Sequence, residues 1–537
     1  MNNSPWLDSY AKYGIEETID PNKFPSVLHL LEEAMHHYSE NIAYIHNGTT
    51  LSFRELDEQS KSLAAWLQIK LGIEKGDRIA VQLPNILEFP IAFLALVRIG
   101  AIQVNVNPLY SASELEHQLS DAGCKTIIMW SGALPKLLES LDRTVIDNVL
   151  VVGQRIGPVE IDPRLSVFVP FEEVLRQGVM LRPKPVLLTG DDLIFLQYTG
   201  GTTGVSKGAA LSHRNLIANI EQFKCVAKDS VRPGVEVQAT AIPLYHIFAL
   251  MGSITYLSIG STNWLVDNPR NLDSLIDVLD TAKPSVFFGV NTLYAALANH
   301  PKTATIDFSN LRTSIGGGAA VLPATSAKWE QLTGRFIREG YGLSETSPLV
   351  SFNPSGINFF TNTTGIPVPN TQIKLLDNNG NEVPLGKSGE ICVRGPQVMS
   401  NYWNASSNND SFTEDGFFRT GDIGSFNQDG FLKIVDRKKD MIIVSGFNVF
   451  PNEIESVIGN CAGVLESACV GTLDEKTGEA VRVYIVKAPF SDLSEYALIE
   501  HCRRHLAAYK IPKHVSFVED LPKSSVGKIL RRQLRDI

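Results

Sequence analysis

Apolar runs of strand length alternate with amphipathic segments of helix length along the first third of the chain. Ser52 with Glu55, and Ser111 with Glu114, have the spacing of capping boxes and predict the starts of two helices, the second ending near Gly123. Strands separated by helices are typical of parallel sheets, so we expect an α/β fold of doubly wound sheets. The apolar runs are 77–83 (DRIAVQL), 101–107 (AIQVNVN), 124–130 (CKTIIMW) and 148–153 (NVLVVG).

The region from about 365 to 435 has a different pattern. Its short apolar runs TQIKLLD, GEICVRG and GFLKIVD are separated by the turn-forming clusters NNGN, GKSG and NQDG. Such spacing predicts a small, mostly antiparallel β-subdomain. After the charged segment DRKKD (436–440), mixed helix and strand signals return. We therefore expect a large N-terminal domain over 1–436 and a small α+β C-terminal domain over 437–537.

Composition narrows the class of protein. The 537 residues are 44% hydrophobic and 20% charged, which is typical of a globular chain with more than one core. The formal net charge of −10 argues against nucleic-acid binding, because the protein would repel a polyanion. We expect a cytoplasmic protein, since the N-terminus lacks a signal-peptide pattern and the apolar stretch 90–97 is too short to span a bilayer. The six cysteines are scattered along the chain without a pattern of close pairs, so we expect neither a disulfide framework nor a zinc site.

The segment Tyr198–Gly208 (YTGGTTGVSKG), here called the phosphate loop, concentrates groups that bind anions. Its glycines allow backbone N–H groups to approach an anion, Thr199, Thr202 and Thr203 add hydroxyl donors, and Lys207 adds positive charge. The segment follows the strand-like run LIFLQ and precedes the helix-like run HRNLIANI. It departs from the Walker pattern, which requires Gly-Lys-Ser/Thr where this chain has Ser-Lys-Gly. From composition alone, phosphate binding and a simple turn are equally good interpretations.

Several motifs taken together resemble one enzyme superfamily. The string YTGGTTGVSKGA resembles the signature of the adenylate-forming superfamily, which includes acyl-CoA synthetases, firefly luciferase and peptide-synthetase adenylation domains. Further motifs of that superfamily follow in order: PLYHIFA (243–249), GGGAAV (316–321), GYGLSET (340–346), TGD (420–422), DRKKDMIIVSGFNVFPNEIE (436–455) and PKSSVGKILRR (522–532). YHIFAL and DRKKDMIIVSGFNV are most similar to the corresponding motifs of bacterial long-chain fatty acyl-CoA synthetases.

The resemblance implies a two-step reaction that uses ATP, Mg²⁺ and CoA. A fatty acid carboxylate attacks the α-phosphorus of ATP, which yields an acyl-adenylate and pyrophosphate, and the thiol of CoA then displaces AMP. Both steps bring anions together, so the protein has to neutralise charge and position the reactants. Two alternatives stay open: a fatty acyl-AMP ligase that loads a carrier protein, and an aromatic acid ligase of the coumarate type. A luciferase-like oxygenase shares the motifs, but nothing in the chain indicates its additional chemistry.

The resemblance also implies residues for the nucleotide and the metal. Glu345 is expected to bind Mg²⁺ together with the hydroxyl of Thr199, which suits a cation that takes few protein ligands. Asp422 would accept hydrogen bonds from the ribose hydroxyls, and Arg437 would reach the ribose or the α-phosphate. Tyr341 would flank the adenine. The set implied for ATP or AMP is Thr199, Gly200, Gly201, Thr202, Thr203, Gly204, Lys207, Gly317, Gly318, Ala319, Tyr341, Gly342, Ser344, Asp422 and Arg437.

Four further residues are implied to act in catalysis or in the motion of the C-terminal domain, which would serve as a mobile lid. Lys528 matches the lysine that reaches the carboxylate and the α-phosphate during adenylation, so it should matter little for thioester formation after the lid has moved. Lys439 matches the hinge, and Gly446 belongs to the segment that lines the thiol tunnel in relatives. His246 lies within the apolar run LYHIFAL, and we expect it to position the acyl carboxylate rather than to act as a general base.

The acyl group is expected to lie between the segments 245–248, 289–294 and 316–321, with Tyr245, Phe248, Val290 and Asn291 in its pocket. These segments are apolar and carry no charge that would pair with a polar acyl tail. A fatty acid therefore fits better than an amino acid, whose ammonium group would need a buried carboxylate. The preferred chain length is not determined by these residues. The sequence leaves open both peripheral association with the cytoplasmic face of a membrane and formation of a homodimer.

Overall fold

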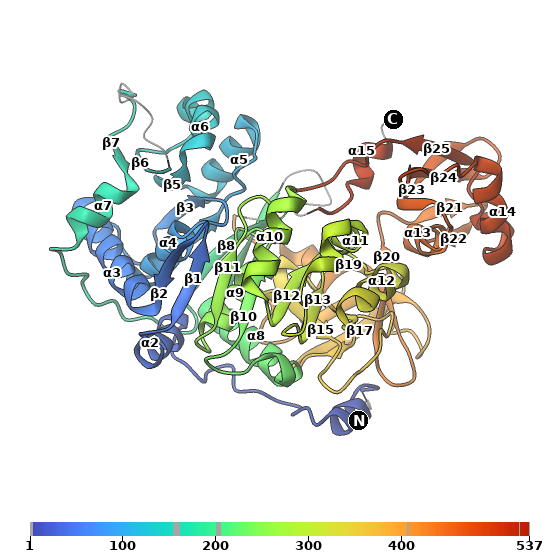
Figure 1. Cartoon of the computed structure of the whole chain (residues 1–537), viewed down its shortest axis with the longest axis horizontal. Helices are drawn as coiled ribbons and strands as arrows, with labels where there is room; N and C mark the ends of the chain where they lie inside the picture. The colour runs from blue at the N-terminus through green and yellow to red at the C-terminus, as the bar shows by residue number, and fades with distance from the viewer. Residues whose placement is uncertain (1–3, 154–161, 200–205, 405–407, 526, 536–537) are drawn as a thin grey trace.

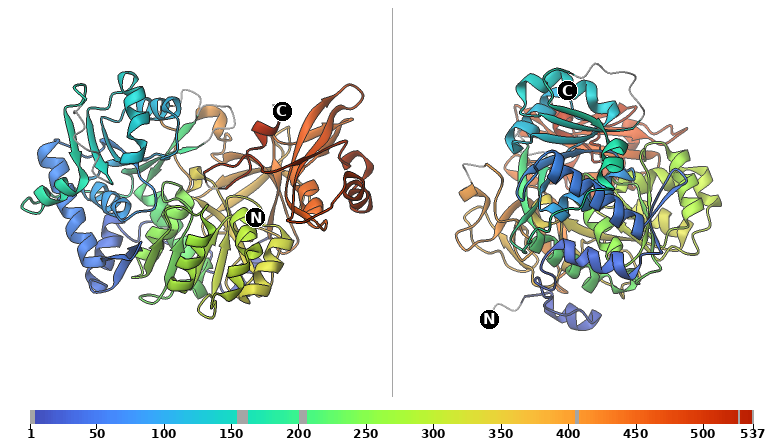
Figure 2. Two further views of the ribbon diagram at one scale, coloured as in Figure 1. Left: turned by 45° about the horizontal axis from the view of Figure 1, so that its top comes forward. Right: turned by 90° about the vertical axis from the view of Figure 1, so that its left-hand side faces the viewer.

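The computed structural model describes residues 4–153, 162–199, 206–404, 408–525 and 527–535. Its strands form two large sheets, one small antiparallel sheet and one C-terminal sheet. The two large sheets make up the body of the molecule, and the C-terminal elements form a separate lobe at one side (Figures 1 and 2). Among the described residues, every helix is too short or too polar to cross a bilayer.

The first large sheet has seven strands in the order β7-β6-β5-β3-β4-β8-β9, and all neighbours except β8 and β9 are parallel. The four apolar runs of the first third form β3 to β6, as the sequence predicts. The strands are β3 (Arg78–Gln82), β4 (Ile102–Asn105), β5 (Thr126–Trp130), β6 (Asn148–Val152), β7 (Val167–Pro170), β8 (Leu193–Thr199) and β9 (Lys207–Ser212).

The second large sheet has nine strands in the order β16-β15-β14-β13-β12-β10-β11-β1-β2. Strands β1 and β10 to β14 pair in parallel, and antiparallel pairs close both edges. The strands are β1 (Ile42–His46), β2 (Thr49–Ser52), β10 (Val237–Thr240), β11 (Thr262–Leu265), β12 (Val286–Gly289), β13 (Thr313–Gly316), β14 (Ile337–Gly342), β15 (Leu349–Phe352) and β16 (Ile366–Pro367).

Helices cover both faces of each large sheet. Successive residues of a strand face opposite sides, so strands that are apolar throughout need cover on both faces. In β12, Phe288 joins the central core and Phe287 joins an outer core. The central core lies between the sheets and holds α3 (Phe53–Lys70), α4 (Glu88–Ile99), α8 (His213–Val226) and α9 (Ile247–Leu257). The outer layers are α5 (Ala112–Ala122) and α6 (Leu134–Ser140) on the first sheet, and α10 (Leu272–Ala282), α11 (Asn291–Asn299) and α12 (Pro323–Thr333) on the second. The expected doubly wound α/β fold is confirmed.

The remaining helices of the body are α1 (Leu7–Tyr13), α2 (Val27–His37) and α7 (Phe171–Gly178).

Both predicted capping boxes form. In α3, the N–H of Glu55 donates to the hydroxyl of Ser52 at 3.2 Å, and the N–H of Ser52 donates to the Glu55 carboxylate at 2.7 Å. Ser111 and Glu114 repeat this exchange at the start of α5, and Gly123 ends that helix in the left-handed conformation at φ +63°. Each box satisfies N–H groups that a helix start would otherwise leave unpaired.

The connection after the phosphate loop differs from the sequence expectation. The sequence indicates a strand, the loop and then the helix of HRNLIANI. Instead, β9 follows the loop and runs antiparallel beside β8, and α8 begins only after it. Residues 207–212 (KGAALS) are too short and too small to stand out as an apolar run, and only pairing with β8 makes them a strand.

The small sheet confirms the antiparallel β-subdomain predicted between 365 and 435. Its order is β17-β18-β19-β20, and every pair is antiparallel. The strands are β17 (Gln372–Leu376), β18 (Gly389–Arg394), β19 (Phe418–Phe426) and β20 (Leu432–Arg437). The boundary placed between residues 436 and 437 falls at the end of β20 and stays a prediction.

The C-terminal lobe has its own sheet and its own apolar core. Strand order is β22-β21-β24-β23, with β25 parallel to β24. Its elements are β21 (Ile442–Val444), β22 (Phe447–Val449), α13 (Pro451–Gly459), β23 (Val464–Asp474), β24 (Gly478–Lys487), α14 (Glu495–His505), β25 (His514–Val518) and α15 (Arg531–Arg535). We refer to this lobe as the lid.

Candidate active site

Three neighbouring strands of the second sheet end at glycines, and the turns beyond them frame the candidate site. β12, β13 and β14 end at Gly289, Gly316 and Gly342, and because they are parallel their carboxyl ends share one edge of the sheet. A β-carbon at Gly317 would lie 3.1 Å from the ring of Phe248, and one at Gly342 would lie 2.1 Å from a backbone carbonyl. These turns therefore require glycine for close packing.

Glu345 lies in the short turn Ser344–Thr346, which follows β14 and contacts β8 and β9. It is only 8% exposed, and burial raises the pKa of its carboxyl group. The hydroxyl of Tyr402 donates to its Oε1 at 2.6 Å, and among the described residues Glu345 forms no salt bridge. A buried carboxylate that lacks a cationic partner is a suitable ligand for a divalent cation.

Tyr402 is a site residue that the sequence did not reveal. Besides its bond to Glu345, its ring lies 5.4 Å from Nζ of Lys207, and its backbone forms a bridge with Ala209 of β9. It thereby connects the carboxylate to the strand that carries Lys207. The only sequence signal is an aromatic pair in the loop NYWN, which by itself does not indicate a site.

Part of the phosphate loop can be located. Thr199 is the last residue of β8 and Lys207 the first of β9, and the two are paired across the antiparallel register. Both side chains are half-buried. The predicted residues Gly200, Gly201, Thr202, Thr203 and Gly204 lie outside the described residues.

Asp422 is buried between two partners. It is 4% exposed, its Oδ1 lies 3.2 Å from Nε of Arg437, and its Oδ2 accepts a hydrogen bond from the hydroxyl of Tyr341 at 2.7 Å. Asp422 and Arg437 face each other across the register of β19 and β20. Burial raises the pKa of the Tyr341 hydroxyl, which therefore stays protonated and keeps donating. The structure thus brings together three residues that the sequence assigned to one nucleotide.

A segment of the lid reaches back to the body of the molecule (Figures 1 and 2). Lys528 lies in this segment, close to Asp422 and Arg437. The hydroxyl of Thr292, in the first turn of α11, donates to the carbonyl of Gly527 at 3.0 Å. The side-chain amide of Asn107 donates to the hydroxyl of Ser525 at 3.2 Å. Lys528 follows directly, so body residues on both large sheets hold its turn.

The environment of Lys528 changes its acidity. Burial and the nearby charge of Arg437 lower the pKa of its ammonium group to about 8, against the attraction of Asp422. His246 lies close enough that the charge of Lys528, after the larger effect of burial, helps to lower the imidazole pKa to about 4. At neutral pH, Lys528 is therefore mostly charged and His246 is neutral.

His246 also serves as the N-cap of α9. The N–H of Phe248 donates to its Nδ1 at 3.4 Å, which leaves the proton on Nε2. A neutral imidazole fixed at a helix start can position a carboxylate, and its lowered pKa makes it a poor proton acceptor near pH 7. The geometry favours the positioning role that the sequence indicated.

The predicted acyl residues lie around the same strand ends. Phe248 packs edge-on against Phe288 at 5.5 Å between ring centroids, and a β-carbon at Gly318 would lie 3.6 Å from the side chain of Val290. Tyr245 faces Ser525 of the lid segment. Asn291 differs from the others, because its side-chain oxygen accepts a hydrogen bond from the N–H of Leu322 at 2.9 Å and so supports a loop.

Three predicted residues lie at the margin of this cluster or outside it. Ala319 is exposed on the turn after β13. Lys439 is exposed between β20 and β21, and burial of its stem lowers the pKa of its ammonium group. Gly446 is at the exposed turn between β21 and β22, at φ +83°, and no described atom lies within 4 Å of where its β-carbon would be. In this position of the lid, Gly446 does not touch the cluster.

Comparison with known sequences identifies the architecture. The model of the AMP-binding enzyme family matches residues 31–403, and the model of the AMP-binding enzyme C-terminal domain matches residues 453–528. A long-chain-fatty-acid–CoA ligase of Salmonella typhimurium is 44% identical, with 99% of this chain and 98% of that protein covered. A protein of the same name from Haemophilus influenzae is 39% identical, with the same coverage. A feruloyl-CoA synthase of an Amycolatopsis species is 32% identical over 91% of this chain and 94% of its own.

Solved structures have the same fold. ATP-bound MatB from Rhodopseudomonas palustris superposes with a TM-score of 0.82 at 28% identity, over 95% of this chain and 98% of that one. The anthranilate CoA ligase AuaEII in complex with anthranoyl-AMP superposes with a TM-score of 0.88 at 24% identity, over 96% of this chain and 98% of that one.

Proposed function

This chain belongs to the AMP-binding enzyme family, and on that premise we propose that it is an AMP-forming long-chain fatty acid–CoA ligase. It would convert a fatty acid, ATP and CoA into acyl-CoA, AMP and pyrophosphate. The observation that carries the proposal is the turn of Lys528, which the body of the molecule holds beside Asp422, Arg437 and His246. The substrate class is supported by the ligases of that name, which are 39–44% identical over 99% of this chain.

In the first step, a carboxylate oxygen of the fatty acid attacks the α-phosphorus, and the bond from that phosphorus to the bridging oxygen of pyrophosphate breaks. Lys528, mostly cationic at neutral pH, would neutralise the carboxylate and the α-phosphate as they approach. Lys207 would bind the outgoing phosphates, and Asp422 would accept hydrogen bonds from the ribose. Preorganised charges of this kind are effective because they need no rearrangement when the reaction occurs.

The donor set also fits Mg²⁺. Glu345 is a buried carboxylate without a salt bridge among the described residues, and its turn contacts β8, the strand that ends in Thr199. Glu345 and the hydroxyl of Thr199 would hold the ion. When bound, Mg²⁺ neutralises phosphate charge and leaves most of its coordination to phosphate oxygens and water.

In the second step, the CoA sulfur attacks the acyl carbonyl, AMP leaves, and the thiol proton is released. In the described position of the lid, no described atom lies within 4 Å of where a β-carbon of Gly446 would be. We infer that the lid rotates near Lys439 after adenylation, so that Lys528 withdraws and the turn around Gly446 faces the adenylate. Such motions separate the requirements of two half-reactions.

The decisive experiment measures AMP release by the purified protein with ATP and Mg²⁺, with and without CoA. The acids are acetate, octanoate, palmitate, oleate and coumarate. The proposal requires turnover that depends on CoA and is greatest with palmitate or oleate, whereas a maximum with octanoate would keep the CoA ligase but indicate medium-chain acids as its substrates. Pyrophosphate release that is indifferent to CoA would indicate a carrier protein as acceptor, a maximum with coumarate would indicate an aromatic acid ligase, and no turnover would refute the ligase assignment.

We also propose that the protein associates peripherally with an anionic membrane through the segment 179–187, which follows α7 at the left edge of Figure 1. Met180 is 86% exposed and Leu187 83% exposed, although both are apolar. The segment also carries Arg182 and Lys184 and no acidic residue. Exposed apolar side chains next to basic ones are typical of surfaces that insert between anionic headgroups.

The membrane proposal is tested by cosedimentation with vesicles. We expect the wild type to bind vesicles that contain phosphatidylglycerol more strongly than vesicles of phosphatidylcholine alone, and the double variant Met180→Glu/Leu187→Glu to lose that binding. Leu385→Glu is the matched control, because Leu385 is 55% exposed on the β-subdomain. Equal binding by the double variant and the wild type would show that the segment 179–187 is not the contact.

A further inference from the structure

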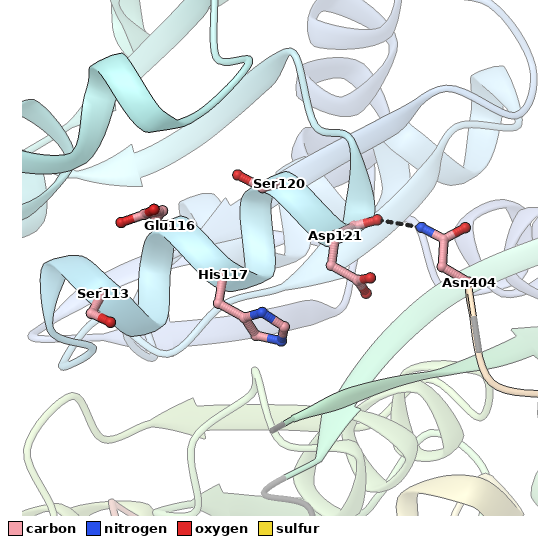
Figure 3. A pocket seen from close by; sticks show the side chains of 6 residues that line it. All are labelled: Ser113, Glu116, His117, Ser120, Asp121 and Asn404. Atoms are coloured by element: carbon pink, nitrogen blue, oxygen red, sulfur yellow. Dashed lines mark hydrogen bonds between the residues drawn. The ribbon is translucent and has the colours of Figure 1, made fainter. Parts of the chain in front are cut away.

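Helix α5 contacts the phosphate loop on both sides of residues 200–205. The hydroxyl of Tyr198, which precedes that stretch, donates to Oδ2 of Asp121 at 2.5 Å. Nε2 of His117 lies 3.0 Å from the carbonyl oxygen of Ser206, which follows it. His117 and Asp121 are one helical turn apart, and in Figure 3 both side chains point to the same side of α5, toward the strands below it.

The same helix also holds the segment that supports Glu345. The side-chain amide of Asn404 donates to the carbonyl oxygen of Asp121 at 2.7 Å (Figure 3). Two residues earlier in the chain, Tyr402 donates to the Glu345 carboxylate. One turn of α5 is therefore bonded to both ends of the phosphate loop and to the support of the expected metal ligand.

Packing alone does not account for these two side chains. Tyr198 is buried and its hydroxyl needs an acceptor, whereas His117 and Asp121 are only half-buried. Both open onto a surface pocket, so they fill no interior space. Its lining residues are Ser113, Glu116, His117, Ser120, Asp121 and Asn404. What His117 and Asp121 contribute is therefore their polar bonds to the two ends of the loop.

We propose that His117 and Asp121 are positioning residues that fix Ser206 and the side chain of Tyr198, beside the β8–β9 ladder, in the arrangement that binds the ATP phosphates. Neither residue touches substrate. The inference rests on the proposed function, because it assigns their effect to the nucleotide that the loop binds. It adds two residues on an outer helix to a site that the sequence motifs place on the strand ends.

The proposal predicts an effect confined to ATP binding and adenylation. Without these bonds the ends of the loop can adopt several arrangements, of which only one binds the ATP phosphates. The apparent affinity for ATP is then multiplied by the fraction of molecules in that arrangement. Thioester formation from a supplied acyl-adenylate needs no triphosphate, so it stays unchanged. A merely structural role would instead reduce both half-reactions and the melting temperature together.

The test compares two pairs of variants. His117→Ala and Asp121→Ala remove the bonds, whereas His117→Gln keeps a donor for the Ser206 carbonyl and Asp121→Asn keeps an acceptor for Tyr198. Titration calorimetry measures the ATP affinity. Pyrophosphate release as a function of ATP concentration measures adenylation, and the reaction of palmitoyl-adenylate with CoA measures thioester formation. We expect each alanine variant to bind ATP roughly tenfold more weakly and to have a correspondingly higher KM for ATP, which is about the contribution of one hydrogen bond. The Gln and Asn variants should stay within about twofold of wild type.

Ser120→Ala is the matched control on the same helix. It removes a hydrogen bond from the Ser120 hydroxyl to the carbonyl of Arg143, 3.0 Å away, without contacting the loop ends. It should leave the ATP affinity unchanged. Tyr198→Phe should weaken ATP binding as much as Asp121→Ala, and combining the two should add little, because both remove the same bond.

The outcomes separate this inference from the proposed function. If the wild type binds ATP and the alanine variants bind it equally well, or if both half-reactions fall equally, the positioning role is overturned while the ligase assignment stands. If the wild type binds ATP and the affinities change as expected but no fatty acid is activated, the positioning role stands and the substrate assignment is overturned. Absence of ATP binding by the wild type would overturn both.

Discussion

Burial shifts the pKa of three residues of the candidate site, Lys528, His246 and Glu345. It lowers the pKa of the Lys528 ammonium group to about 8 and that of the His246 imidazole to about 4, and it raises the pKa of the Glu345 carboxyl. In each case the charged form loses hydration on entering the protein. A bound nucleotide and its cation would restore the missing charge partners, so the site is better suited to the bound state than to the free one.

The first prediction at the residue scale concerns Lys528. Lys528→Ala should reduce ATP–pyrophosphate exchange with palmitate by about 10²- to 10³-fold, the usual cost of one preorganised charge. Thioester formation from supplied palmitoyl-adenylate should stay within about twofold of wild type. Lys523→Ala is the control, because Lys523 is in the same segment but pairs with Glu466 and Asp520. Equal loss of both half-reactions in Lys528→Ala would contradict the assigned role.

A second prediction concerns Glu339, a buried carboxyl on β14 that the proposed reaction does not use. It accepts a hydrogen bond from the N–H of Val321 at 2.8 Å, is 6% exposed, and has its pKa raised to about 8 by burial. A raised native pKa contributes stability that is fully present below the unfolded value of about 4.5 and is lost as the pH rises through 8.

The wild type should therefore lose roughly 2–3 kcal/mol of unfolding free energy between pH 6 and pH 9 because of this group. Glu339→Gln keeps an acceptor for the Val321 N–H but does not ionise, so its stability should change less over that range. Urea unfolding at pH 6, 7.5 and 9 measures the difference. Parallel pH profiles of the two proteins would show that Glu339 does not titrate in this range.

At the scale of elements, the phosphate loop is a connection between two antiparallel strands rather than between a strand and a helix. The N–H groups of its ends are partly committed to the β8–β9 ladder, whose register runs from Leu193–Ser212 to Thr199–Lys207. Strand β9, and not a helix N-terminus as in Walker-type loops, therefore follows the loop. Under the proposed function, hydroxyl groups, Lys207 and support from α5 would take the place of the helix N-terminus.

The capping boxes provide a prediction at this scale. Ser52→Ala should destabilise the protein by about 1 kcal/mol, because the N–H of Glu55 at the start of α3 loses the hydroxyl that accepts its hydrogen bond. Turnover should stay at the wild-type level, since α3 contributes no residue to the site. Ser62→Ala, in the interior of the same helix, is the control and should change stability by less than about 0.5 kcal/mol. Denaturant midpoints measure both, and equal effects would show that the cap contributes nothing.

At the scale of the whole molecule, polar contacts join the lid to the body both near the site and near the hinge. Near the site, Thr292 and Asn107 bind the segment that carries Lys528. Near the hinge, the N–H of Asn452 donates to Asp436 at 2.8 Å, and Arg531 lies 3.3 Å from the same carboxylate. Such hydrogen bonds and ion pairs can be exchanged for bonds to water when a domain moves.

The proposed rotation predicts a variant with the opposite defect to Lys528→Ala. Gly446→Leu should leave adenylation within about twofold and reduce thioester formation at least tenfold, because a side chain at the turn would obstruct the thiol. Gly386→Leu is the matched control: its φ is also +83° and its surroundings are equally open, but it lies in the β-subdomain. Both half-reactions are followed separately. Unchanged thioester formation in Gly446→Leu would argue that this turn does not face CoA.

The sequence by itself determined the elements and the chemistry of the motifs. Local patterns predicted β3 to β6, the two capping boxes and the antiparallel subdomain, because strand alternation and capping depend on residues a few positions apart. The ordered motifs predicted the family, and with it the assignment of Glu345, Asp422, Arg437 and Lys528 to the candidate site. The predicted residues 200–204 of the phosphate loop lie outside the described residues.

Tertiary structure alone decided which distant segments meet. Strand β9 exists because it pairs with β8, Tyr402 is a site residue because its loop packs beside Glu345, and His117 and Asp121 matter because α5 lies over both ends of the phosphate loop. The sequence around each of these residues contains no pattern that indicates its role. The role of Tyr402, His117 and Asp121 depends on a partner more than fifty positions away, and that of β9 depends on pairing with a strand across the loop. The position of the lid, with Lys528 inside the site and Gly446 outside it, likewise depends on contacts between domains that no sequence period encodes.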